Sequence, residues 1–216
     1  MIIPLGQWIL QEACHQAQQW AASIPVTHPL FVSVNVSGKQ LQMPEFIDRL
    51  REIIQESGIP NTALKLEITE STAMEDVEAT FEIFRRLRSL DINLGLDDFG
   101  TGYSSLSYLH RLPVQTLKLD KSFVQDLEHS RESQAIAKTI VALARTLRLK
   151  TIAEGIETVA QLRFLQALGC NYGQGFWFSP PLPPHQASQL LAQPPEWGRS
   201  PQATRSPSRK KPSHPD

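Results

Sequence analysis

The 216-residue sequence contains only two cysteines, Cys14 and Cys170, which are too few for a disulfide framework. The sequence contains no C-x-x-C motif and no histidines paired at i, i+4, so no residue pattern indicates a zinc site. The 21 basic and 22 acidic side chains give a net charge of −1, so no charge excess indicates DNA as a partner. No apolar run approaches the ~18 residues of a membrane span. A signal peptide begins with a basic region, but no lysine or arginine precedes Lys39. We therefore expect a cytoplasmic protein without a membrane span.

Composition divides the chain into two parts. A hydrophobic fraction of 41% is sufficient to fill a core. Residues 193–216 hold six of the 16 prolines, five basic and two acidic side chains, and almost no aliphatic residues. Too little apolar surface is present there to offset chain entropy. The sequence predicts one domain over residues 1–192 and a disordered, basic, proline-rich tail over 193–216.

Helical and strand periodicities alternate through the first 192 residues. A helix over residues 5–22 is predicted to bury a face made of Leu5, Trp8, Ile9, Ala13, Ala17, Trp20 and Ile24. Strands are predicted over residues 31–36, 64–69, 92–97, 114–119, 150–153 and 170–173. Further helices are predicted to start near Pro44 and to cover residues 77–87, 104–109, 132–148, 158–168 and 184–191. Strands interleaved with helices in this way are typical of parallel βαβ units.

An open doubly wound sheet and a (β/α) barrel both fit this alternation. An open sheet concentrates its functional groups at a switch point, usually after a glycine-rich first turn, and no G-x-G-x-x-G follows any predicted strand. A barrel carries functional groups at the carboxyl ends of many strands. Polar residues here follow strand after strand, at Asn35, Glu67, Asp97, Asp98, Lys118, Glu154 and Gln174. We therefore predict an α/β fold of the TIM-like barrel type.

Several of these strand ends carry oxygen ligands. Asn35, Glu67 and the pair Asp97 and Asp98 end otherwise apolar strands, and a barrel would direct them towards a common axis. Carboxylate and amide oxygens without cysteine or histidine suit a hard cation such as Mg²⁺, Mn²⁺ or Ca²⁺. Adjacent aspartates allow one carboxylate to bridge two metal ions, an arrangement that supports phosphodiester hydrolysis. The alternative for each acid alone is an ordinary, satisfied polar group at a strand end.

Five motifs along the chain resemble those of the EAL domain, a family of bacterial cyclic-di-GMP phosphodiesterases. The resemblance runs from residue 1 to about residue 192. The motifs are residues 66–71 (LEITES), 96–106 (LDDFGTGYSSL), 117–120 (LKLD), 153–157 (AEGIE) and 172–176 (YGQGF).

The resemblance implies a role for each matching residue in hydrolysis of cyclic-di-GMP to linear pGpG. It implies a two-metal site that uses Mg²⁺ or Mn²⁺ and is inhibited by Ca²⁺. The implied metal ligands are Asn35, Glu67, Asp97, Asp98 and Glu154, with Asp97 as the bridge. The implied catalytic group comprises Lys118, which would orient the attacking water, Glu154, and Glu70, which would hold the loop after Asp98. Gln174, Asp120 and Glu157 are the implied substrate-binding residues.

The sequence departs from the family pattern in one respect. It contains neither the family's Glu-Ala-Leu nor the following Leu-Arg-Trp, so the first two barrel strands and one metal ligand have no counterpart. We expect an incomplete barrel of about six strands, two bare strand edges, and weak activity of residues 1–216 alone. The resemblance also implies a homodimer through residues 100–126, and upstream sensor or cyclase domains in the full gene.

Two other functions compete with hydrolysis. A non-catalytic cyclic-di-GMP receptor or protein-interaction module is the main alternative, because the glutamate of the Glu-Ala-Leu motif is absent. A barrel that metabolises sugars or acids is disfavoured, because the sequence shows neither a setting for a lysine Schiff base nor a phosphate-binding glycine loop near the last strands.

Overall fold

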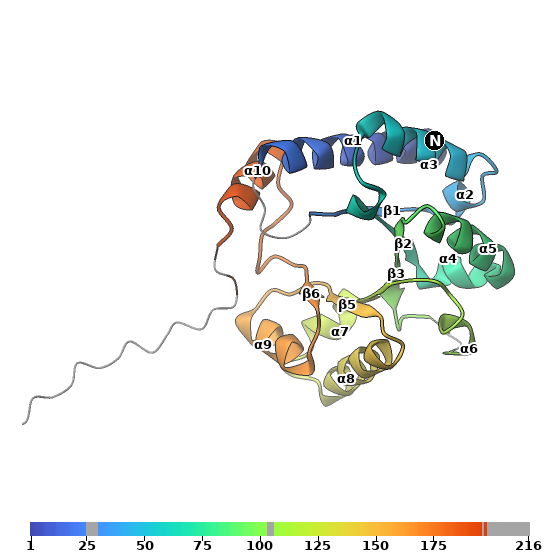
Figure 1. Ribbon diagram of the computed structural model, residues 1–216. Helices are drawn as coiled ribbons and strands as arrows, with labels where there is room; N and C mark the ends of the chain where they lie inside the picture. Colours follow the sequence, from blue (N-terminus) through green and yellow to red (C-terminus); the bar gives the residue numbers. More distant parts are fainter. Residues whose placement is uncertain (25–29, 103–105, 196, 198–216) are drawn as a thin grey trace, which may run out of the picture.

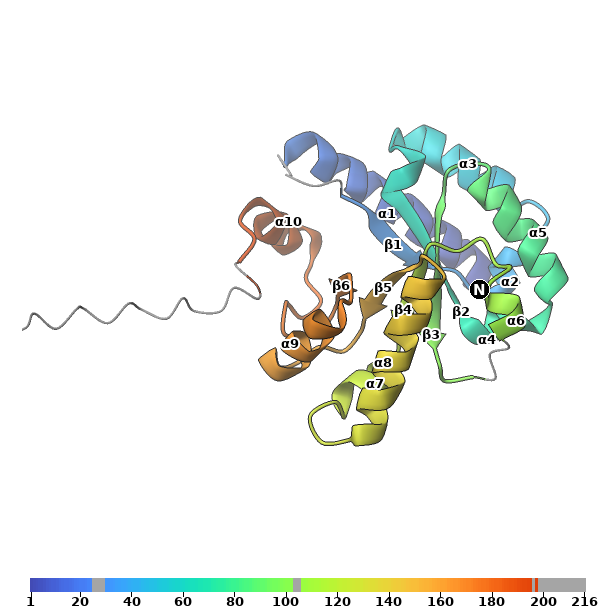
Figure 2. The same ribbon diagram turned by 60° about the horizontal axis from the view of Figure 1, so that its bottom comes forward.

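The computed structural model describes residues 1–24, 30–102, 106–195 and 197, with the side chains of residues 106 and 107 left undescribed. Six strands form one parallel sheet, and their order in the sheet is their order in the chain. They are β1 (Val32–Asn35), β2 (Leu64–Thr69), β3 (Asn93–Phe99), β4 (Thr116–Leu119), β5 (Lys150–Ala153) and β6 (Tyr172–Gly173). The strands follow an arc, and the helices lie around its outside (Figures 1 and 2). The fold is an incomplete TIM-like barrel, as predicted.

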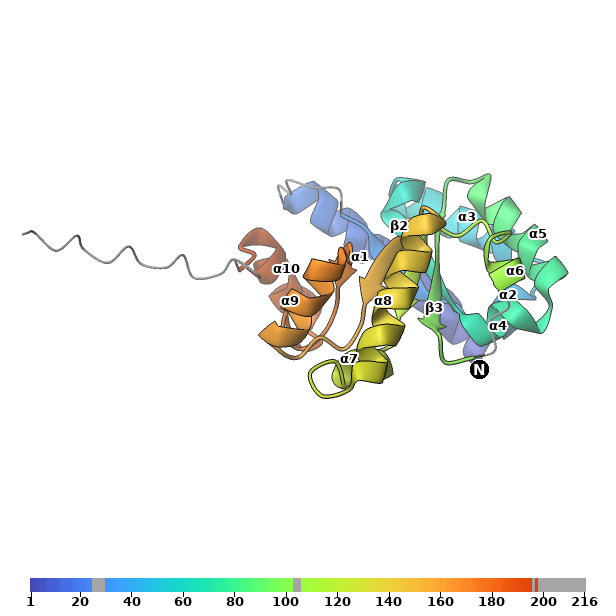
Figure 3. The same ribbon diagram turned by 90° about the horizontal axis from the view of Figure 1, so that it is seen from below.

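Seven helices correspond to those predicted from periodicity. They are α1 (Ile2–Ser23), α3 (Phe46–Ser57), α5 (Val77–Arg88), α6 (Leu106–Leu109), α8 (Arg131–Thr146), α9 (Val159–Leu168) and α10 (Pro184–Ala192). The amphipathic pattern places α8 on the strands β4 and β5 (Figure 3).

Three short helices were not predicted, and a 3-10 turn covers Asn61–Ala63. The helices are α2 (Gly38–Leu41), α4 (Glu70–Glu75) and α7 (Lys121–Gln125). Each begins after a polar residue, Ser37, Thr69 or Asp120, whose side chain accepts a hydrogen bond from a backbone N–H of the first turn. Such caps satisfy donors that a short helix would otherwise leave unpaired. Three of the helices therefore start within a few residues of a strand end that carries a candidate site residue.

The two faces of β2 show how the sheet divides apolar from polar side chains. Leu64, Leu66 and Ile68 are fully buried in the hydrophobic core. Lys65 and Glu67 alternate with them and therefore point to the opposite face of the strand. Both are also buried, because that face lines the inside of the curled sheet.

The predicted buried face of α1 is correct for Ala17 and Ile24 but wrong in the first half of the helix. Leu5, Trp8 and Ile9 are exposed, with Trp8 at 57%. The helix instead buries a narrower face of mostly small residues, Gly6, Leu10, Cys14 and Ala17, against α2, α3 and β1. A Cβ atom at Gly6 would collide with the Gln40 side chain, so the small residues permit a closer approach than the larger apolar residues would.

Two contacts connect the end of the described chain to the rest of the fold. The Trp20 indole Nε1–H donates to Ser188 Oγ at 2.9 Å and joins α1 to α10. The Trp197 ring packs edge-on against Phe178, with 5.8 Å between ring centroids. The rest of the predicted tail from residue 198, together with residue 196, lies outside the described residues. In the described part of the chain, no helix has the length and apolar character that crossing a bilayer requires.

Candidate active site

The carboxyl ends of the parallel strands bring distant acidic residues to one edge of the sheet. Asn35 is in register with Glu67, and Thr69 is in register with Asp97. Lys118 lies on β4, and Glu154 follows β5 directly. The side chains of Glu67, Asp97, Lys118 and Glu154 meet on the inside of the curled sheet.

Lys118 is the centre of this arrangement. Its Nζ donates to Glu67 Oε2 at 2.6 Å and to Asp97 Oδ2 at 3.0 Å, and it lies 2.6 Å from Glu154 Oε1. The lysine is only 3% exposed, and its three donors match three carboxylate partners from three other strands. An ion-paired lysine of this kind joins β2, β3 and the end of β5 through β4.

The charges of this group shift one another's pKa values. Burial alone would lower the pKa of Lys118, but the hydrogen bonds that it donates to Glu154, Glu67 and Asp97 outweigh this effect and raise the pKa above its usual value. The pKa of Glu154 is raised, first by burial and then by the charges of Asp97 and Glu67, although Lys118 opposes the shift. The two directions are consistent with an excess of negative charge around one buried cation.

A β-bulge in β3 places both aspartates opposite Lys118 in the sheet, and Asp97 forms an ion pair with it. Leu96 pairs with Leu117 and Phe99 pairs with Leu119, so Asp97 and Asp98 together oppose Lys118. Asp98 has a positive φ of 53°, which is strained for a residue other than glycine. The Asp98 N–H donates to Asp97 Oδ1 at 2.9 Å. Bulges often redirect a side chain beside an active site.

The acidic residues at this edge fit a hard cation. Asp97, Asp98 and Glu154 each offer a carboxylate oxygen, and these oxygens lie within 4.8 Å of one another. Burial, followed by the charges of Asp97 and Asp120, raises the pKa of Asp98, although the charge of Lys118 opposes the shift. An all-oxygen donor set suits Mg²⁺ or Mn²⁺.

Glu70 holds the loop that follows the two aspartates. Its Oε2 accepts a hydrogen bond from the Gly100 N–H at 2.8 Å. Gly100 has a φ of 97°, a conformation that glycine adopts without steric cost. A Cβ atom at Gly102 would lie 3.1 Å from Glu70 Oε1, so the loop passes close to this carboxylate. Residues 103–105 of the corresponding motif lie outside the described residues.

The other predicted site residues lie outside the ion-paired group. Asn35 is exposed at the end of β1, next to Glu67 in register. Asp120 accepts a hydrogen bond from the Ser122 N–H at 2.9 Å and caps α7. Glu157 and Gln174 are exposed, and the backbone N–H of Gln174 donates to the Ala153 carbonyl beside Glu154. The structure therefore brings Glu67, Asp97, Asp98, Lys118 and Glu154 together and leaves the others at the rim.

Sequence reasoning missed Lys65, which lies on the same face of β2 as Glu67. It is 5% exposed, and its Nζ lies 4.1 Å from the centre of the Phe31 ring. The signal was present, because a period of two along β2 places residues 65, 67 and 69 on one face.

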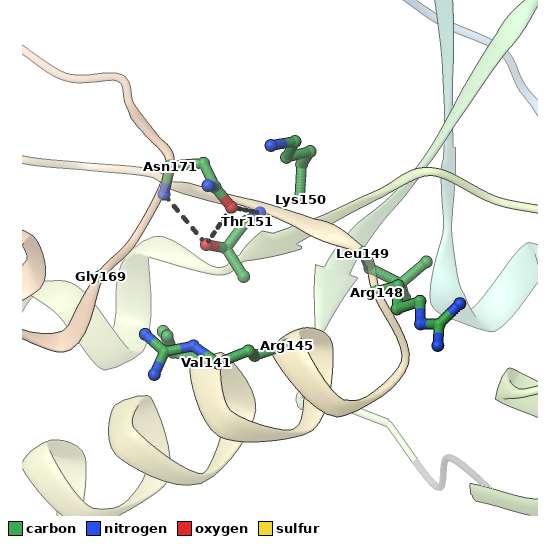
Figure 4. Close-up of a pocket in the computed structure, with 8 residues that line it drawn as sticks. All are labelled: Val141, Arg145, Arg148, Leu149, Lys150, Thr151, Gly169 and Asn171. Atoms are coloured by element: carbon green, nitrogen blue, oxygen red, sulfur yellow. Dashed lines mark hydrogen bonds between the residues drawn. The ribbon is translucent and has the colours of Figure 1, made fainter.

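A surface pocket of about 230 Å³ lies elsewhere, between the end of α8, the start of β5 and the segment before β6 (Figure 4). Arg145, Arg148 and Lys150 line it, but their charged groups point in different directions. Thr151 and Asn171 use their polar atoms on each other. The pocket lies at the amino end of β5, away from the carboxylates, so the acidic edge remains the candidate site.

Comparison with known proteins agrees with this geometry. The family model for the EAL domain matches residues 1–181. The bifunctional diguanylate cyclase/cyclic di-GMP phosphodiesterase MucR of Pseudomonas aeruginosa is 44% identical over 193 residues, which cover 89% of this chain and 27% of MucR. This chain thus spans about a quarter of the length of the curated relatives it matches.

Solved structures give the same family. The MucR phosphodiesterase in complex with c-di-GMP superposes with a TM-score of 0.82 at 43% identity, covering 86% of this chain and 74% of that one. Klebsiella pneumoniae BlrP1 with manganese and cyclic di-GMP has a TM-score of 0.74 at 27% identity, with 83% and 45% covered. The match over residues 1–181 together with these relatives shows that the chain belongs to the EAL domain family.

Proposed function

We propose that this chain contributes the catalytic domain of a cyclic-di-GMP phosphodiesterase that yields linear pGpG and needs Mg²⁺ or Mn²⁺. The observation that carries this proposal is the contact of Lys118 with Glu67, Asp97 and Glu154 at the carboxyl edge of the sheet. Membership of the EAL domain family and the cyclic di-GMP phosphodiesterase activity named for MucR support it.

The proposed metal ligands follow from the positions of the oxygen-bearing side chains. Asn35, Glu67 and Asp97 would hold one cation, and Asp97, Asp98 and Glu154 would hold the second, with Asp97 shared. The mutual approach of the Asp97, Asp98 and Glu154 oxygens supports the second set. Divalent cations bound there would activate a water molecule and offset negative charge on the phosphate.

Lys118 has two proposed tasks at this site. Without cations, its ammonium holds three carboxylates in place through charge-assisted hydrogen bonds. With cations and substrate bound, it would orient the attacking water and stabilise the charge that develops at phosphorus. In the cation-free protein the hydrogen bonds to these carboxylates raise the pKa of Lys118, so the first of these tasks is that of a protonated ammonium.

The remaining residues would act at the rim of the site. Glu70 would position the loop after Asp98 through its hydrogen bond with Gly100. We assign Gln174, Asp120 and Glu157 to substrate binding, because they follow β6, β4 and β5 at the same carboxyl edge. Asp120 would act at the start of α7, which it caps.

The direct test is hydrolysis of cyclic-di-GMP by the purified chain, followed by chromatography of the products. Because one metal ligand of the family pattern has no counterpart here, we expect slow formation of pGpG with Mg²⁺ or Mn²⁺, inhibition by Ca²⁺, and no product from Asp97→Asn. Binding of cyclic-di-GMP by calorimetry without pGpG formation would instead indicate a receptor. If the chain neither bound nor hydrolysed cyclic-di-GMP, the proposed function would be refuted.

We also propose a homodimer that forms through residues 100–126. This region includes the loop held by Glu70, so association of two chains would be coupled to the position of Asp98. Analytical ultracentrifugation of the purified chain measures the association directly, and a monomer at micromolar concentration would contradict it.

A further inference from the structure

Lys65 is a buried cation that the proposed mechanism does not use. It lies on β2 two residues before Glu67, and both side chains occupy the inner face of the curled sheet. Two residues along a strand separate backbone positions by roughly 7 Å, which is short enough for strong charge interaction in a buried site.

The side chains of Lys65 and Glu67 both lie beside Gly95 of β3. A Cβ atom at Gly95 would lie 3.6 Å from Glu67 Cγ and 3.7 Å from Lys65 Cδ. The aliphatic parts of both side chains therefore lie over the same glycine. Lys65 therefore lies beside Glu67, one of the carboxylates that bind Lys118.

The surroundings of Lys65 keep its charge unneutralised. Its Nζ lies 4.1 Å from the Phe31 ring centre and 5.7 Å from the Tyr172 ring centre. Among the described residues, no carboxylate forms an ion pair with it. Ring faces attract an ammonium ion but cancel none of its charge.

Charge interactions connect Lys65 to the site. Burial lowers the pKa of Lys65, the charge of Glu67 raises it, and the charge of Lys118 lowers it. The two lysines and Glu67 thus influence one another. Lys118 bonds directly to three carboxylates of the site, and the carboxylate of Asp98 lies close to two of these. A second positive charge on the same face of the sheet therefore reduces the excess of negative charge at the site.

We propose that Lys65 is a charge-balancing residue, which stabilises the cation-free acidic site and lowers its affinity for divalent cations. The inference rests on the proposed metal site and adds a residue that controls its occupancy. In the cation-free protein, Lys65 reduces repulsion among the carboxylates. When a divalent cation binds, the same charge repels it, so the two effects have opposite signs.

This opposition distinguishes charge balance from a purely structural role. If Lys65 only packed against Phe31 and Tyr172, its removal would loosen the fold and weaken cation binding or leave it unchanged. If it balances charge, its removal destabilises the cation-free protein and strengthens cation binding. A neutral side chain of similar length, as in Lys65→Met, separates the two roles.

The matched control is Lys138→Met. Lys138 also lies over a phenylalanine ring, 5.8 Å from the centre of Phe164, but it is exposed on α8. Lys65→Arg retains the positive charge inside the sheet. Both variants should bind cations with wild-type affinity.

Two measurements on the full chain test the proposal. Calorimetric titration with Mn²⁺ should give a dissociation constant roughly tenfold lower for Lys65→Met than for wild type. Thermal unfolding in EDTA should give a lower melting temperature for Lys65→Met. If circular dichroism shows that Lys65→Met does not fold, Lys65→Gln takes its place with the same expected directions.

The possible failures are distinguishable. Wild-type binding of Mn²⁺ with equal or weaker binding by the neutral Lys65 variants would overturn the role of Lys65 and leave the proposed metal site intact. Absence of Mn²⁺ binding in wild type and in these variants would overturn the metal site itself, and with it this inference.

Discussion

The backbone N–H of Gly100 donates a hydrogen bond to Glu70 Oε2 at 2.8 Å, across 30 residues of sequence. Glu70 is the first residue of α4 and is buried, whereas Gly100 follows the two aspartates of β3. One carboxylate therefore connects the end of β2 to the loop beyond the bulge. We therefore expect the position of Asp98 to depend on this contact.

Replacement of Glu70 tests that dependence. Glu70→Ala removes the acceptor of the Gly100 N–H, so we expect the loop to shift and turnover of cyclic-di-GMP to fall by about 10²-fold. Glu70→Gln keeps one acceptor oxygen and should retain more activity. Steady-state kinetics of both variants checks this, and equal activity of Glu70→Ala and wild type would show that the contact does not control the site.

We expect the loss of Lys118 and the loss of Asp97 to have different effects on stability and on cation binding. Lys118→Met leaves Glu67 and Asp97 buried without a cation, so in EDTA we expect a loss of about 3–5 kcal/mol of stability. Divalent cations should restore much of that loss but not the turnover, because the ammonium is absent. Asp97→Asn should lose cation binding and turnover together. Denaturant unfolding with and without Mn²⁺ measures this, and failure of Mn²⁺ to stabilise Lys118→Met would contradict the assignment.

The buried thiol of Cys14 predicts a pH dependence of stability. Burial raises the pKa of Cys14 to about 11 from its usual 9.0. The folded state therefore favours the protonated thiol, and this contribution is complete below pH 9 and is lost as the pH rises from 9 to 11. A shift of this size corresponds to roughly 2–3 kcal/mol.

Urea unfolding at pH 8 and at pH 10.5 measures the Cys14 contribution. Other groups titrate in this range, so the comparison is with Cys14→Ala, which should lose less stability between the two pH values than wild type does. Thiol labelling at neutral pH should modify the partly exposed Cys170 first. Equal labelling rates for both cysteines in the folded protein would contradict the burial of Cys14.

The hydrogen bond between Trp20 and Ser188 predicts how firmly α10 is attached. Trp20→Phe removes the indole N–H that donates to Ser188 Oγ, so we expect about 1 kcal/mol of destabilisation and faster amide exchange in α10. The control is Trp8→Phe, because Trp8 is exposed and its indole makes no hydrogen bond among the described residues. Hydrogen-exchange mass spectrometry distinguishes the two variants, and unchanged exchange in Trp20→Phe would show that α10 is held by other contacts.

Local patterns in the sequence were sufficient to predict the strands and long helices, because both depend on periodicities that a few residues reveal. The face of α1 was not predictable in this way. The pattern counts apolar residues, and Trp8 and Leu5 are apolar, but the choice between two faces depends on which one fits α3 and α2 closely. Gly6 and Cys14 fit because they are small.

The candidate site was likewise predictable from the sequence only in part. The position of Glu67, Asp97 and Glu154 at strand ends followed from the sequence, since parallel strands bring their carboxyl ends to one edge. The three partners of Lys118 did not, because they depend on the relative placement of β2, β3, β4 and β5 and on the bulge at Asp97. Lys65 was overlooked although the alternation along β2 places it on the inner face.

The sheet order has a consequence for folding kinetics. Each strand pairs with the strand that precedes it in the chain, from β1 to β6. No pairing needs a distant strand to arrive first, so the loop-closure entropy of each step is limited to one helical crossover. A chain of this topology can add its strands in the order of synthesis, and the Lys118 contacts form only when β4 joins β2 and β3. If strands are added in this order, the charged centre is complete only when Glu154, which follows β5, reaches Lys118.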